Sequence, residues 1–309
     1  MRVTMGGRPA GASTSTPEEG TRTLHGRRYR RIGEADRPAV EALLRSAVPD
    51  DYLLPMVGDW IERGMVLGGW QGDRLVAILR LDDLGDGEGW VGGIRVAPEL
   101  RRQGVARDLM EFTFDVSRHH GLATLRLLIE AENEASQHLA RSLGFERTQE
   151  IVHLAGPLVA PAERPRVVPL RSAPEADPEG FAWVRSFHGL FSPTVPELFR
   201  LVRASRSRME RESREGTLYA SDRPGAAFTL SPPRPVTWSD RTVRAFSPLE
   251  GPLELLLQGA AELTREDGSL VDCFLPASED ALSTATRQGL VRGALWGASI
   301  GLYELVLGG

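Results

Sequence analysis

The hydrophobic positions along the first half of the chain change period several times, which indicates helices and strands in a mixed order. Apolar residues that alternate or run together predict strands at 29–32, 66–71, 74–81, 89–96, 124–129 and 145–154. Apolar residues spaced three or four apart predict helices at 36–47, 52–63, about 105–119 and 134–143. The dipeptide Gly72-Asp73 between two of these strands predicts a tight hairpin. The elements follow the order β-α-α-β-β-β-α-β-α-β.

A similar order of elements returns in the second half of the chain. Strands are predicted at 167–170, 217–220, 226–230, 242–246 and 269–275, helices at 181–191, 195–212, 253–265 and 280–289, and a closing strand or hairpin at 293–307. Between the halves, Pro157, Pro161 and Pro165 interrupt any regular period, which is typical of a stiff linker. Residues 1–22 are rich in Gly, Ser, Thr and Pro, which predicts a disordered tail. The expected domains are 23–156 and 167–309, joined by a linker at 157–166.

The junction between one predicted strand and the next helix has the composition of an anion site. After Val96 the chain passes through a charged turn of the form Arg-x-x-Gly-x-Ala, in which Gly104 and Ala106 leave the helix start free of bulky side chains. The first N–H groups of a helix have no partner inside it, and with the helix dipole they suit a phosphate. Positive charge is added by Arg101, Arg102 and Arg107. We interpret residues 101–107 as a pyrophosphate cradle; the alternative is an ordinary loop before a helix.

The corresponding junction in the second half lacks these features. It reads Ser247-Pro248-Leu249-Glu250-Gly251-Pro252, without an arginine. Pro252 has no N–H to donate, and Glu250 would repel a phosphate. We therefore expect a phosphate site in the first half of the chain and none at this junction.

Two segments of the first half resemble the motifs of the GNAT-type N-acetyltransferases. Val96–Ala106 resembles their motif A, Val-x-Pro-x-x-Arg-x-x-Gly-x-Gly/Ala, and Asn133–Phe145 resembles their motif B. The resemblance covers residues 24–157, and the motifs have the expected order and spacing. Asn133 is the only asparagine in a chain that contains no lysine. A GC-rich genome explains why both residue types are rare, and yet an asparagine is present at this motif position. The implied fold is α+β, with two GNAT-like domains in tandem, each a mixed central sheet flanked by helices, the second degenerate.

The resemblance implies transfer of an acetyl group from acetyl-CoA to an amine of a small molecule or peptide, by direct attack on the thioester. Acetyl-CoA is then a cosubstrate, and no metal is expected. Strand backbone and Asn133 would bind the pantetheine arm, while the cradle would hold the pyrophosphate. The implied coenzyme-binding residues are Ile94, Val96, Arg101, Arg102, Gln103, Gly104, Val105, Ala106, Arg107, Asn133 and Ser136. For Asn133, an N-cap of the following helix is an alternative, and both roles are compatible.

The acid and the base of this chemistry are not evident from the motifs. Many relatives carry a tyrosine seven residues after the asparagine, where this chain has Ala140. Many also carry a carboxylate in the strand before the cradle, where this chain has Gly92-Gly93. An alkyl amine with a pKa of about 10.4 is mostly protonated near pH 7, so a proton acceptor is needed. The candidates are Glu88, Asp82 and Asp83, which are alternatively solvated turn residues, with Glu130 and His153 as weaker candidates.

Composition narrows the remaining classes of protein. A net charge of −5 argues against a nucleic-acid-binding protein. Cys273 is the only cysteine, which excludes an internal disulfide and favours a buried strand residue. His119-His120 has no third ligand at the spacing of a metal site. No apolar run is long enough to span a membrane, so we expect a cytoplasmic protein. The oligomeric state stays open, and the rival hypothesis is an acyl-CoA-binding regulatory protein without catalysis.

Overall fold

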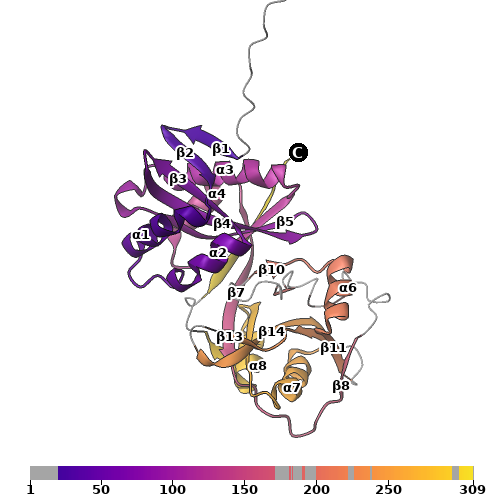
Figure 1. The fold of residues 1–309 in the computed structure, drawn as a ribbon. Helices are drawn as coiled ribbons and strands as arrows, with labels where there is room; N and C mark the ends of the chain where they lie inside the picture. The colour runs from indigo at the N-terminus through magenta and orange to yellow at the C-terminus, as the bar shows by residue number, and fades with distance from the viewer. Residues whose placement is uncertain are drawn as a thin grey trace, which may run out of the picture. The chain divides into compact units, whose positions relative to one another are not determined.

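The computed structural model describes residues 20–170, 181, 183, 190–191, 200–221, 226–236, 239–293 and 299–308. The chain divides into two compact units, Met1–Arg80 with Gly93–Val116 and Leu81–Gly92 with Ser117–Gly309. Three elements continue from one unit into the other, namely β4 (Arg74–Gly85), β5 (Glu88–Val96) and α3 (Val105–His119) (Figure 1). Most of the predicted helix at 181–191 and the start of that at 195–212 lie outside the described residues. The predicted domain boundaries differ from those of the compact units and stay predictions.

The first unit contains a β-hairpin, two helices and the strands that lead to the cradle. Its own elements are β1 (Thr21–Leu24), β2 (Arg27–Arg31), α1 (Arg37–Ala47), α2 (Val57–Arg63) and β3 (Met65–Gln71), with 3-10 turns at Glu34–Asp36, Leu54–Met56 and Pro98–Leu100. The strands follow the order β1-β2-β3-β4, and β2 is antiparallel to β1 and to β3. Strand β1 has no counterpart among the predicted strands, and it begins inside the segment that we expected to be a tail.

Local sequence explains the helices and turns of this unit. In α1, Val40 and Leu43 lie on the buried face, and Pro38 lies in the first turn, where its missing N–H costs no helical bond. The hairpin between β3 and β4 turns at Gly72, whose φ of +59° suits glycine. The predicted helix and hairpin are therefore confirmed.

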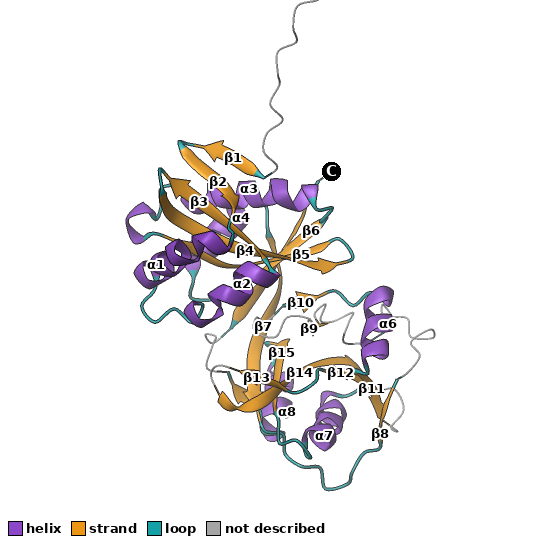
Figure 2. Ribbon diagram, viewed as in Figure 1, coloured by secondary structure: helices purple, strands orange, loops and turns teal. Residues whose placement is uncertain are grey.

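The second unit contains the ends of β4 and α3, the start of β5, and the rest of the chain. Its other elements are β6 (Thr124–Glu130), α4 (Glu134–Ser142), β7 (Glu146–Gly156), β8 (Val167–Pro169), β9 (Leu190–Phe191), β10 (Leu201–Val202), α6 (Arg206–Glu215), β11 (Leu218–Ser221), β12 (Ala227–Leu230), β13 (Arg234–Val236), β14 (Ser239–Glu250), α7 (Leu253–Thr264), β15 (Leu270–Pro276), α8 (Glu279–Arg287), β16 (Val291–Arg292) and β17 (Ile300–Val306) (Figure 2). The strands follow the order β4-β5-β6-β17-β7-β15-β14-β12-β11-β8.

The last strand of the chain, β17, lies between two strands of the first half. It is antiparallel to both: Ile300–Val306 pairs with Thr124–Glu130 of β6, and Ile300–Glu304 pairs with β7. Strand β7 pairs along its other edge with β15 of the second half. The predicted closing strand at 293–307 is thus present in part, but it completes the sheet of the predicted first domain. A first domain cut at residue 156 would lack this strand.

The two halves repeat one pattern of strands and helices. Strand β5 pairs in parallel with β6 over Glu88–Trp90, and β14 pairs in parallel with β15 over Val243–Ala245. Helix α3 lies between β5 and β6 along the chain and α4 follows β6, as α7 lies between β14 and β15 and α8 follows β15. This repeat confirms the expected α+β tandem arrangement.

The junction that corresponds to the cradle is extended in the second half. Strand β14 continues to Glu250, and its residues Phe246, Ser247 and Pro248 pair with β12. Helix α7 then begins at Leu253, directly after Pro252. The arginine-bearing turn between β5 and α3 therefore has no counterpart between β14 and α7, as the sequence predicts.

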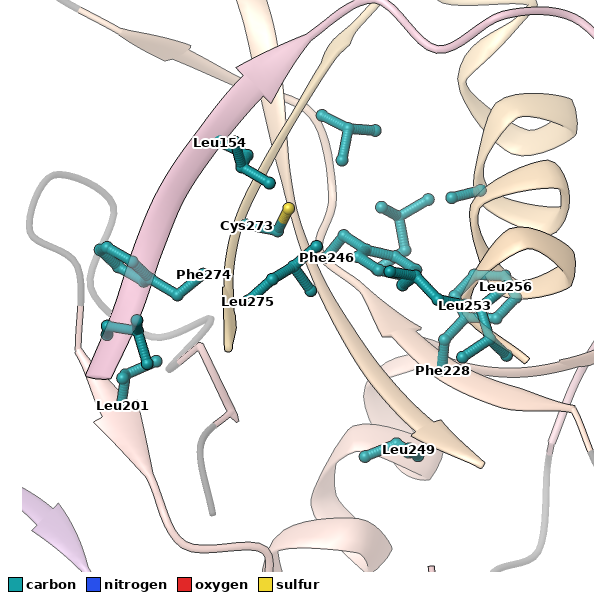
Figure 3. Close-up of a cluster of buried hydrophobic side chains, with 14 of the residues drawn as sticks. Leu154, Leu201, Phe228, Phe246, Leu249, Leu253, Leu256, Cys273, Phe274 and Leu275 are labelled. Carbon is teal, nitrogen blue, oxygen red and sulfur yellow. The ribbon is translucent and has the colours of Figure 1, made fainter. Parts of the chain in front are cut away.

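A buried hydrophobic cluster forms the core of the second half. Figure 3 shows Phe228, Phe246 and Leu256 in this cluster together with Cys273. Cys273 is fully buried, and this burial raises the pKa of its thiol well above the usual value. A thiol of this kind is a poor nucleophile, so the predicted structural role of Cys273 is confirmed.

Candidate functional site

The end of β5 is fixed by short backbone and side-chain bonds. Ala97 donates its N–H to the carbonyl oxygen of Val76 at 2.9 Å, and this residue is fully buried. The 3-10 turn that follows is closed by Gln103, whose Nε2 donates to the carbonyl oxygen of Glu99 at 2.7 Å. The chain is thus held in a tight loop before α3. Gln103, one of the predicted coenzyme-binding residues, therefore uses its side chain to stabilise this loop.

The start of α3 has the open donors that a phosphate requires. The helix begins at Val105, and the N–H of Asp108 makes the first bond of the helix, to the carbonyl oxygen of Gly104 at 3.0 Å. Helix geometry therefore leaves the N–H groups of Val105 and Ala106 without an acceptor inside the helix. These groups carry the positive end of the helix dipole.

Gly104 directly precedes α3, and the surroundings of its Cβ position are open. Its φ is +80°, and no atom lies within 4 Å of the position that a Cβ would occupy. Its neighbour Arg102 also has a positive φ, of +61°, and is exposed. A positive φ is uncommon for a residue other than glycine and is found disproportionately at binding sites. Gly104 itself therefore adds no side chain at the start of the helix.

The side chain of Arg101 bonds to two backbone carbonyl oxygens of the fold. Its Nη2 donates to the carbonyl oxygen of Ala47 at 2.6 Å, and its Nε donates to that of Val96 at 3.3 Å. The guanidinium thereby ties the end of α1 to the end of β5. The geometry gives Arg101 a role in holding the cradle in place, in addition to its charge.

A buried carboxylate anchors the first turn of α3. Asp108 accepts hydrogen bonds from Tyr29 at 3.2 Å and His25 Nδ1 at 3.0 Å, and Arg27 lies 3.8 Å away. Burial, together with the charge of Asp108, raises the pKa of the Tyr29 hydroxyl well above its usual value. The β1–β2 hairpin therefore fixes the helix that bears the cradle. Sequence reasoning missed this anchor because β1 is short and polar and Tyr29 is far from Asp108 along the chain.

Gly93 explains why the strand before the cradle has no carboxylate at this position. Its φ is +65°, and a Cβ would lie 1.9 Å from the ring of Trp60. No side chain fits there without moving the tryptophan. Beyond it, the predicted pantetheine-binding residues Ile94 and Val96 are half-buried at the end of β5.

We expect Gly93→Ala to lower the free energy of unfolding by about 3 kcal/mol, because it adds both backbone strain and overpacking. The measurement is urea denaturation followed by tryptophan fluorescence and by circular dichroism. The matched control is Gly72→Ala, which has a similar φ of +59° but open space around the Cβ position. Gly72→Ala therefore shows the effect of backbone strain alone, which we expect to lower the free energy of unfolding by about 1 kcal/mol. Equal losses in the two variants would contradict the contact with Trp60.

The motif B residues lie at the start of α4. Asn133 Oδ1 accepts the N–H of Ser136 at 3.1 Å, so Asn133 is the N-cap of the helix. This confirms the capping alternative, and the amide nitrogen of Asn133 is still a donor. Asn133 and Ser136 belong to the second compact unit, and the cradle belongs to the first.

The helix face that would carry the missing tyrosine is closed. Ala140 is buried, and its carbonyl oxygen accepts the N–H of Phe145 at 3.0 Å. A tyrosine does reach this helix from β17: the hydroxyl of Tyr303 donates to Gln137 Oε1 at 3.2 Å. Tyr303 is itself buried, which favours a packing role.

The three carboxylates proposed as bases all have structural partners. Asp82 accepts a hydrogen bond from the fully buried Arg200 at 2.8 Å. Glu88 lies 2.9 Å from the guanidinium of Arg126. The carboxylate of Asp83 accepts the N–H of Gly85 at 2.8 Å within a turn. The geometry thus favours structural roles for all three, because each is committed to fixing a strand end or a neighbouring segment.

The weaker candidate His153 and the pair His119-His120 have partners within the fold. His153 Nε2 lies 2.6 Å from Asp272 Oδ1, with both side chains buried, and burial raises the pKa of Asp272. The rings of His119 and His120 lie edge to face, 5.7 Å apart. Among the described residues, no group of three or more potential ligands could hold a metal ion.

Comparison with known proteins identifies the class of this fold. Residues 37–145 match the model of the acetyltransferase (GNAT) family. A search of curated proteins found no match. Within the part of the chain that the structure describes, no helix has both the length and the apolar character needed to cross a membrane.

Two solved structures have the same fold over nearly the whole chain. A GCN5-related N-acetyltransferase from Sphaerobacter thermophilus is 15% identical, with a TM-score of 0.55 over 92% of this chain and 96% of its own. A tandem GNAT protein from the clavulanic acid biosynthesis pathway is 14% identical, with a TM-score of 0.51 over 92% of this chain and 99% of its own. At this identity the likeness concerns the fold, which is that of two GNAT-like domains in tandem.

Proposed function

We propose that the chain is an acetyl-CoA-dependent N-acetyltransferase that acts on an amine of a small molecule or peptide. The observation that carries this proposal is the junction between β5 and α3, where a helix begins directly after Gly104 and the surroundings of the Cβ position of this glycine are open. A pyrophosphate fits this arrangement, because it needs several N–H donors and close approach to the backbone. The match of residues 37–145 to the GNAT family model supports the same ligand.

The N–H groups of the backbone and of one side-chain amide would bind acetyl-CoA in this reaction. The N–H groups from Arg102 to Arg107 hold the pyrophosphate, and the backbone of Ile94 and Val96 pairs with the pantetheine arm. The amide nitrogen of Asn133 donates to the pantetheine while its oxygen caps α4. A strand N–H near Ile94 polarises the thioester carbonyl, which favours the charge that develops on its oxygen.

Proton transfer in this scheme does not depend on Glu88, Asp82 or Asp83. The ammonium first loses a proton to water, and the free amine nitrogen then attacks the carbonyl carbon. The C–S bond breaks, coenzyme A leaves as the thiolate, and the second proton lost from the nitrogen passes to water. A thiol with a pKa of about 8.5 gives a fair leaving group near neutral pH, so no dedicated acid is required. The engagement of all three carboxylates also favours a second candidate function, a regulatory protein that binds acyl-CoA without catalysis.

A transfer assay separates the two candidates. Acetyl-CoA is incubated with a panel of small amines, amino acids and peptides, and the released CoA is measured with a thiol reagent. The chain suits this assay because its one thiol, Cys273, is fully buried. It also has no lysine, so acetyl groups found by mass spectrometry on an acceptor are not confused with self-acetylated side chains. Acetyl-CoA binding without turnover on any amine would favour the regulatory protein.

A further inference from the structure

A ring of alternating charges joins the two halves of the chain at the point where β5 leaves β6. Arg126 is the last residue of β6 in register with β5, opposite Trp90. Its side chain is only 4% exposed. A guanidinium in this position needs carboxylate partners, because an uncompensated buried charge is strongly destabilising.

The partners of Arg126 come from opposite ends of the sequence. Its Nη1 lies 2.9 Å from Glu88 Oε1 on β5, and its Nε donates to Glu304 Oε2 on β17 at 2.6 Å. Glu304 lies directly opposite Arg126 in the register of β17 with β6. Cross-strand pairs of this kind stabilise the pairing of the strands that carry them.

Arg203 closes the ring from the second half. Its backbone N–H donates to Glu88 Oε2 at 3.0 Å, and its guanidinium lies 3.8 Å from Glu304 Oε1. The four side chains carry two positive and two negative charges. Their exposure rises from 4% at Arg126 to 21% at Glu304 and 56% at Arg203. The ring therefore has a buried end, at the divergence of β5 from β6, and a solvated end.

We propose that Glu304 is a positioning residue for acetyl transfer: through Arg126 it fixes the last paired residues of β5 and β6. This inference rests on the proposed function, in which the backbone of β5 beyond this pairing receives the thioester. It assigns a role to the degenerate second half, whose last strand places a carboxylate on the strands of the first half. Glu304 acts through Arg126 and is not assigned a contact with substrate.

The test is Glu304→Gln, which keeps the size of the side chain and removes its charge. We expect kcat to fall about tenfold, because small errors in strand position are costly at a reacting centre. The acetyl-CoA Kd from calorimetry should stay within about twofold, because the cradle belongs to the other compact unit. The control is Glu146→Gln, an exposed carboxylate opposite Glu304 on β7, which should leave both constants unchanged.

A double-mutant comparison shows whether Glu304 acts through Arg126. In an Arg126→Gln background, Glu304→Gln should change kcat by less than about twofold, because the charge that it compensates is gone. If Glu304→Gln alone fails to fold, this comparison still tests whether Glu304 acts through Arg126. A tenfold loss in that background, or an unchanged kcat in folded Glu304→Gln, would overturn the positioning role. A wild-type chain without turnover on any amine would contradict the proposed function and this role together.

Discussion

A chain that ends at Gly293, and so lacks β17, is expected to lose its folded structure in the first half as well as the second. Ile300, Leu302 and Tyr303 of this strand are at most 2% exposed. Each contributes about 1.5–3 kcal/mol of burial, roughly 5–9 kcal/mol together. That sum is comparable to the whole stability of a typical domain, about 5–15 kcal/mol. Loss of β17 would also leave the facing edges of β6 and β7 unpaired, which promotes aggregation.

The measurement is circular dichroism and sedimentation of the purified chain. The matched control ends at Leu307, so that β17 is complete and only the last two residues are missing. It should fold as the full chain does. The fragment 23–156, cut at the predicted domain boundary, should behave like the chain that ends at Gly293. A monomeric, folded fragment that binds acetyl-CoA would contradict the completion of the first sheet by β17.

Gly104→Glu is expected to weaken acetyl-CoA binding by at least about 100-fold, a loss of about 3 kcal/mol. The new side chain would fill the open space beside the cradle and place a negative charge where the phosphates bind. The helix itself still forms, because the chain makes its first helical bond with the carbonyl oxygen of this residue. Calorimetry gives the affinity, and thermal unfolding shows that the variant is folded.

The control for this variant is the same substitution at the other end of α3. Gly121 has a φ of +71° and no atom within 4 Å of its Cβ position, so Gly121→Glu carries similar strain and the same charge. It should bind acetyl-CoA as the wild type does. Equal losses at the two sites would show that strain or net charge, and not the cradle, controls the affinity.

Local sequence predicts the elements that carry the candidate site. The cradle can be predicted from the sequence because its glycine, its arginines and the start of its helix follow one another within a few residues. The N-cap of α4 can be predicted for the same reason, because Asn133 and Ser136 are close along the chain. The absence of a cradle before α7 is predicted equally well, because Pro252 and Glu250 act locally.

The features that sequence reasoning missed all depend on distant contacts. No local pattern shows that β17 pairs with β6 and not with a strand of its own half. No pattern shows that Asp82 and Glu88, which look like free carboxylates in a turn-rich segment, meet Arg200 and Arg203. The tertiary fold decides which charged groups are buried together, so the sequence could not show that these two candidate bases contact arginines.

A calorimetric titration of the intact chain with acetyl-CoA tests most directly whether the first half alone binds the coenzyme. We expect one site per chain, because the cradle lies between β5 and α3 and has no counterpart between β14 and α7. The site should disappear in Gly104→Glu and persist in Gly121→Glu. Two equivalent sites per chain, or no binding by the wild type, would contradict this expectation.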